Sequence, residues 1–280
     1  MPSTAASCSS DLTVASSGTL PPLMNRPDPL VDVRAILSDA WRLFQVSWLG
    51  CLPLALLASA ASTAPSREGV RLGERPGFEH SPEWWGVCAA SAALTVLCLS
   101  AVLLRQAWLA DGDRRNPWPA MQAAGRALPR TLGLLLLLTA PLALTVMLLA
   151  AHPIAIVVGL CASLGLLLWM AFAWPALLVE GLSPAAALRR GAELVRGRLR
   201  SALIAIAMIY SVVVVYMLLT TILINLTLSV SGMPRPTGDW QRAISGLLLL
   251  IVGAVLSVWV SAAWIAAYRR LCASARADER

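Results

Sequence analysis

Residues 131–179 read TLGLLLLLTAPLALTVMLLAAHPIAIVVGLCASLGLLLWMAFAWPALLV, an uncharged stretch of 49 residues. Because roughly 20 apolar residues of helix cross a hydrocarbon core about 30 Å thick, this stretch is long enough to cross a membrane twice. Four other uncharged stretches are each long enough to cross once: 43–66, 84–104, 201–234 and 243–268. Only 13% of the 280 residues are charged and 58% are hydrophobic, whereas soluble domains carry about 25% charged residues. The sequence therefore predicts an all-α membrane protein.

The uncharged stretches divide into six transmembrane helices, near 48–64, 84–104, 131–150, 153–176, 201–226 and 243–267. The segments that connect and flank them alternate in arginine content, with 17 arginines on one side of the membrane and 5 on the other. The positive-inside rule assigns the arginine-rich side to the cytoplasm, so both termini are expected there. All 22 basic residues are arginine, which is typical of a GC-rich bacterial genome. We therefore expect a multi-pass protein of a bacterial cytoplasmic (inner) membrane.

The chain divides into three parts. Residues 1–28 are rich in Ser, Thr and Pro and lack the apolar core of a signal peptide. We expect them to be disordered, and Met24 is a candidate for the true start of the protein. Residues 29–272 are expected to form the six-span membrane domain, and residues 273–280 a cytoplasmic tail.

Three stretches on the cytoplasmic side resemble one another. The third has Ser183 at the position of a helix N-cap and Pro184 at the first helical position, and each stretch carries apolar residues at i, i+4, i+7 and i+11. These apolar stripes are Leu188, Ala192, Val195 and Leu199 in the third stretch, Met121, Gly125, Leu128 and Leu132 in the second, and Leu37, Trp41, Phe44 and Trp48 in the first. The pattern predicts three parallel repeats, each an interfacial amphipathic helix followed by a two-span hairpin.

The segment from Trp174 to Arg200 reads WPALLVEGLSPAAALRRGAELVRGRLR, and two shorter motifs lie far from it: ILSDAWRLF at 36–44 and AAYRRL at 266–271. With these motifs the chain resembles, over residues 30–272, a family of bacterial integral membrane proteins. The family includes the YciC-like proteins and the membrane domain attached to some glycerophosphoryl diester phosphodiesterases. The resemblance implies six spans in a cytoplasmic membrane. It does not imply the phosphodiesterase activity, because the catalytic domain is a separate soluble barrel that this sequence does not encode.

Four charged residues on the cytoplasmic side are candidate contacts for a lipid or a protein partner. Glu180 lies where the fourth span leaves the membrane, and it either contacts a ligand, ion or partner or is simply an acid near a helix N-terminus. Arg189, Arg196 and Arg200 follow it in the third amphipathic stretch. These arginines either bind anionic headgroups, at about 1 kcal/mol each, or serve only as topology signals.

The sequence points to no enzymatic chemistry. The only histidines are His80 and His152, and no nucleophile–histidine–acid set, metal motif or phosphate-binding loop accompanies them. We therefore expect no catalytic residue, metal or cofactor, and no nucleic-acid partner, since the arginines flank membrane spans. Membrane lipids, anionic ones among them, and an unknown protein partner are the expected partners, and a homo-oligomer is compatible with the sequence. The alternative is a channel or carrier for small or lipid-like molecules, which a continuous polar lumen would favour.

Overall fold

The computed structural model describes residues 33–72, 81–113, 116–149, 171–196, 199–230 and 239–278. For residues 138–149, 223–230 and 239–245, and for a few others, it describes the backbone alone. The described parts form the helices α1 (Val33–Leu72), α2 (Pro82–Ala110), α3 (Pro117–Leu149), α5 (Pro184–Arg196), α6 (Leu199–Val230) and α7 (Asp239–Asp278). Residues 171–179 are also helical, and no strand occurs within the described ranges. The tail at 1–28 lies outside them.

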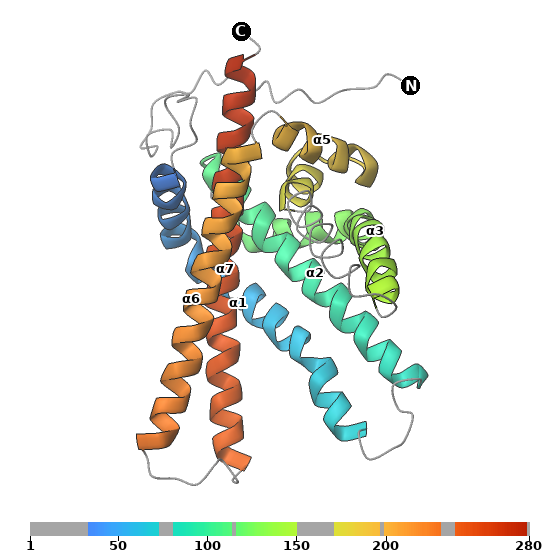
Figure 1. The fold of residues 1–280 in the computed structure, drawn as a ribbon, viewed down its shortest axis with the longest axis vertical. Helices are drawn as coiled ribbons and strands as arrows, with labels where there is room; N and C mark the ends of the chain where they lie inside the picture. Colours follow the sequence, from blue (N-terminus) through green and yellow to red (C-terminus); the bar gives the residue numbers. More distant parts are fainter. Residues whose placement is uncertain are drawn as a thin grey trace.

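Helix α1 is central to the arrangement, because it packs along both α2 and α7 (Figure 1). Helix α3 packs on α2, and α6 lies beside α7. The short helix α5 lies at the same end of the molecule as the C-terminal part of α7, in the upper part of Figure 1. We call this the α5 end. At the opposite end, α1 and α6 finish and α2 and α7 begin.

Three of the described helices are long and apolar enough to cross a membrane: Arg34–Pro65, Pro82–Ala110 and Gly246–Ala275. They contain the first and second predicted spans, and the sixth from Gly246 onward. A shorter apolar helical stretch, Ala202–Tyr216, forms part of the fifth. The third and fourth predicted spans, near 131–150 and 153–176, fall in large part outside the described side chains. The protein is thus all-helical over its described length, with three helices suited to a membrane.

Two of the three expected interfacial helices are not separate elements. Helices α1 and α3 each run from the amphipathic stretch into the apolar stretch without interruption, whereas α5 ends at Arg196 before α6 begins at Leu199. The sequence carries Gly197 at this last junction, and glycine disfavours a continuous helix by about 1 kcal/mol relative to alanine. The boundary expected between the membrane domain and the C-terminal tail, at 272/273, falls inside α7, which stays helical to Asp278.

The predicted apolar stripes are wrong by one residue in the first two stretches. In the third stretch Val195 is buried as predicted, at 5% exposure, but the other three predicted residues are not. Trp41 is 52% exposed and Leu199 is 51% exposed, although both were expected to face inward. The buried positions precede the predicted ones, and they are Ile36, Ala40, Leu43 and Ser47 in α1, Ala120, Ala124 and Thr131 in α3, and Ala187, Gly191 and Leu194 in α5. Small residues let membrane helices approach closely while bulky side chains face outward. A shift of one residue turns the buried face by about 100°.

A fully buried glutamine joins the three membrane-suited helices. The Gln106 Nε2 atom in α2 donates hydrogen bonds to Ser47 Oγ in α1 at 3.2 Å and to the Val258 carbonyl in α7 at 2.9 Å. Alanines fill much of the space around these contacts, among them Ala55, Ala101 and Ala254. The described core is therefore a packed one, in which the Gln106 Nε2 group joins neighbouring helices.

Candidate functional site

Glu180 marks the end of a deeply buried helical segment. Residues 171–178 are all buried, and the helix stops where the Glu180 N–H bonds to the Ala176 carbonyl at 3.0 Å. Gly181 then has a φ of +67°, a conformation that favours glycine and commonly ends helices. Helix α5 begins at once, with the Ser183 hydroxyl accepting a hydrogen bond from the Ala186 N–H at 3.4 Å. The predicted Ser183 cap and the Pro184 start are thus confirmed.

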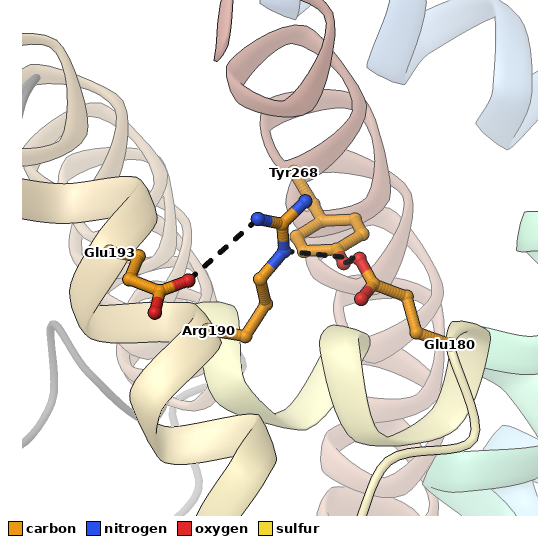
Figure 2. Close-up of polar contacts among 4 residues, drawn as sticks. All are labelled: Glu180, Arg190, Glu193 and Tyr268. Carbon is orange, nitrogen blue, oxygen red and sulfur yellow. Dashed lines mark hydrogen bonds and ion pairs between the residues drawn. The ribbon is translucent and has the colours of Figure 1, made fainter. Parts of the chain in front are cut away.

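The Glu180 carboxylate connects α5 with α7 (Figure 2). The Tyr268 hydroxyl in α7 donates a hydrogen bond to Glu180 Oε1. The same oxygen lies 3.6 Å from Arg190 Nε in α5, and Arg190 Nη1 lies 3.9 Å from Glu193 Oε2. Both distances fit ion pairs but are too long for hydrogen bonds. Arg190 therefore lies between two carboxylates.

The surroundings of Arg190 favour its protonated, positively charged form. Partial burial, the largest single cause, lowers the pKa of its guanidinium, but the Glu180 carboxylate together with Cys272 and Tyr268 outweighs burial, so the pKa lies above its usual value. The guanidinium thus stays protonated at any physiological pH. Its positive charge is already balanced by neighbours and is less available to a ligand than that of an unpaired arginine.

A surface hollow of about 440 Å³ opens over this cluster. We call it the α5 hollow, and it is lined by Glu180, Leu182, Ser183, Ala185, Ala186, Arg189, Arg190 and Glu193. Arg189 is exposed, and no hydrogen bond or ion pair joins it to another described residue. Arg196 is also exposed but does not line the hollow. Of the four predicted contacts, Glu180 and Arg189 therefore come together; the side chain of Arg200 lies outside the described residues.

Three consecutive residues of α7 bind acidic side chains from three separate segments of the chain: Tyr268, Arg269 and Arg270. We call these three residues of α7 the α7 clasp. Besides the Tyr268 contact to Glu180, Arg269 Nη2 lies 2.7 Å from Asp111 Oδ2, at the C-terminal end of α2, and donates to the Ala107 carbonyl at 2.6 Å. Arg270 Nε donates to Asp39 Oδ2 in α1 at 2.8 Å. Asp39 is only 6% exposed, so its carboxylate is the most buried of the three acids.

The sequence motifs did not indicate the roles of Asp39 and Asp111 or the part played by the clasp. One signal was available, because Asp111-Gly112 repeats the pattern of Glu180-Gly181. Gly112 also has a positive φ, +84°. Both acid–glycine pairs precede a capping residue and a proline, Asn116-Pro117 in one case and Ser183-Pro184 in the other. The AAYRRL motif at 266–271 carries their partners, which no local pattern could reveal.

The site can bind charged groups, and its described residues suggest no other chemistry. Within the described ranges no group of three or more His, Cys, Asp or Glu side chains could hold a metal ion. Arg130 Nη1 in α3 donates to the Gly181 carbonyl at 3.3 Å and so holds the loop that forms one wall of the hollow. The hollow therefore has a built frame on three elements: α3, α5 and α7.

Comparison with protein-family models, with curated proteins and with solved structures finds no match. The family resemblance drawn from the sequence motifs thus stays an expectation. What the protein does has to be argued from the α5 hollow and the α7 clasp.

Proposed function

We propose that the protein is a non-enzymatic bacterial inner-membrane protein that binds the phosphate group of a lipid in the α5 hollow. The observation that carries this proposal is the contrast between its two arginines. Arg190 lies between Glu180 and Glu193, whereas Arg189, at the same surface, is exposed and has no partner among the described residues. An unpaired guanidinium can form two parallel hydrogen bonds with a phosphate, which makes arginine well suited to this group.

The position of the hollow along the bundle supports a headgroup ligand. It lies where the apolar segment 171–178 ends, and Tyr268 on its other side lies near the end of the apolar stretch of α7. Headgroups lie next to the hydrocarbon layer, at the ends of such segments. Val179, directly before Glu180, is 40% exposed and offers an apolar contact beside the polar one. A lipid could contact the polar hollow with its headgroup and Val179 with the beginning of an acyl chain.

The same proposal includes six spans in three parallel repeats, with both termini in the cytoplasm. Its supports are the arginine asymmetry and the burial pattern. Ile36, Ala120 and Ala187 are separated by shifts of 84 and 67 residues, and each is fully buried. The same shifts relate Ala40, Ala124 and Gly191, which are also buried. Matching burial at matching positions is expected of repeated units.

The topology has a direct test. A reporter that is active only in the cytoplasm, fused after Arg280, is expected to be active, because the α5 end carries the arginine-rich segments. A periplasm-only reporter inserted at Gly77 is expected to be active as well. Activity of the periplasmic reporter at Arg280 would contradict the six-span arrangement.

Lipid binding is tested by replacing Arg189 with Gln in the full-length protein. We expect about a tenfold loss of bound phospholipid, measured by native mass spectrometry, since one charge-assisted bidentate contact contributes about 1.4 kcal/mol or more. Arg42→Gln is the matched control: Arg42 is exposed, does not line the hollow, and its removal changes net charge equally. Equal lipid loss in both variants, or none in either, would leave Arg189 as a topology signal.

The described core favours this role over a channel or carrier. Gln106, its largest fully buried polar side chain, bonds to α1 and α7, and alanines close the space around it. Such packing fits a helical bundle that binds its ligand at a surface on one end, rather than in a lumen between its helices.

A further inference from the structure

The α5 hollow carries no net charge. Its lining includes two carboxylates, Glu180 and Glu193, and two guanidiniums, Arg189 and Arg190. A phosphodiester alone would bring one negative charge close to both acids. Like charges at such distances repel in a partly desolvated site, so a purely anionic headgroup is poorly matched to the hollow as a whole.

The two carboxylates also have unused acceptors. Both contacts of Glu180 are made by Oε1, and Oε2 has no hydrogen bond or ion pair with the other described residues. The Glu193 side chain is 56% exposed, and its contact with Arg190, at 3.9 Å, is a loose one. A carboxylate in this state can accept hydrogen bonds from a donor-rich cation. Within the described part of the chain, the hollow therefore offers one unpaired cation and two carboxylates with free acceptor capacity.

We propose that the α5 hollow selects a phosphoethanolamine headgroup, with its phosphate at Arg189 and its ammonium at Glu193 and Glu180. This inference rests on the proposed function and adds the headgroup class. A primary ammonium has three N–H donors and one positive charge, so it can satisfy the free acceptors and cancel the charge of the phosphate. A trimethylated choline keeps the charge but has no N–H donor, and a glycerol headgroup has hydroxyl donors but no positive charge.

The test is competition among three phospholipids with identical acyl chains, carrying ethanolamine, choline or glycerol headgroups. Full-length protein is exposed to an equimolar mixture, and the retained lipids are counted by native mass spectrometry. We expect the ethanolamine lipid to exceed each of the others by about fivefold, a ratio in the range of one ion-paired hydrogen bond. A further arm adds soluble glycerophosphoethanolamine. Displacement of the lipid by a comparable concentration of this compound would overturn the assignment of the ligand to the membrane.

Two variants connect the preference to particular side chains. Glu193→Gln is expected to lower the ethanolamine-to-choline ratio to about one while the total of bound lipid falls by less than about twofold, since the phosphate contact remains. Glu83→Gln is the matched control, because Glu83 is an exposed acid in the first turn of α2, at the opposite end of the molecule. Because the Glu193 side chain is largely exposed, we expect Glu193→Gln to fold normally. An unchanged melting temperature would confirm this.

Failure of the ethanolamine assignment and failure of the proposed function give different experimental results. Equal retention of the three lipids, or a preference for the glycerol lipid, with binding still dependent on Arg189, overturns the ethanolamine assignment and leaves the phosphate site standing. Binding that does not depend on Arg189 for any lipid overturns the proposed function itself. Retention of a protein partner in place of lipid at this surface would do the same.

Discussion

Replacing Arg270 with Gln is expected to lower the free energy of unfolding by about 3 kcal/mol, because the variant leaves the Asp39 carboxylate buried without its cation. Asp39 is 6% exposed and accepts two hydrogen bonds from Arg270 through one oxygen. The pair joins α1 near its beginning to α7 near its end, across 231 residues of sequence. Denaturant unfolding of the detergent-solubilised protein, followed by tryptophan fluorescence, measures the loss.

The matched control is Arg269→Gln, the same change one residue earlier. Arg269 is paired with Asp111, whose side chain is 61% exposed, so water can solvate the remaining carboxylate. We expect a loss of about 1 kcal/mol, in the range of an exposed ion pair together with the hydrogen bond to Ala107. Equal losses in the two variants would show that burial of Asp39 does not set the strength of the clasp.

Replacing Leu194 with Asp is expected to be the most damaging change in α5, with a loss of about 4 kcal/mol in the free energy of unfolding. Leu194 is only 2% exposed and belongs to a core cluster with Phe172 and Ile206. An unpaired carboxylate at this position would have to be buried without a partner, or it would force α5 off the bundle. The protein should then lose its monodisperse peak in size-exclusion chromatography.

Leu188→Asp is the informative comparison for this second prediction. The sequence stripe places Leu188 inward, but the structure buries it only in part, one residue beyond Ala187. We expect Leu188→Asp to cost less than half as much as Leu194→Asp. If Leu188→Asp proved the more harmful, the inward face of α5 would be the one that the sequence stripe predicts.

The membrane character of the chain could be predicted from composition because a long uncharged helix has few other places to lie. The predicted span at 84–104 lies within the helix Pro82–Ala110. Helix orientation could not be predicted in the same way. The stripe rule assumes that large apolar side chains face inward, and in these stretches Trp41 and Leu199 face outward while Ala40 and Ala187 are buried. The rule belongs to helices in water, where bulky apolar groups avoid the solvent.

The candidate site was predictable only in its local parts. Ser183 and Pro184 define the start of α5 through backbone chemistry between near neighbours, and Glu180 stood out as the acid at the end of an apolar segment. Its partner Tyr268 lies 88 residues away. Contacts of that kind depend on how whole helices pack, and in one sequence nothing distinguishes a tyrosine that meets Glu180 from one that faces lipid.

The α7 clasp also orders the events of biogenesis. Helix α7 is synthesised after every segment whose acid it holds, so the ribosome releases Asp39, Asp111 and Glu180 before any of their α7 partners exists. Until then the carboxylates of Asp39 and Glu180 must stay where water can reach them, because burial of an unpaired charge is costly, whereas Asp111 stays exposed even in the folded protein. The nascent helices can enter the membrane one by one, yet the α5 end must remain open. We expect it to close late, when the last helix brings one hydroxyl and two guanidiniums to these acids.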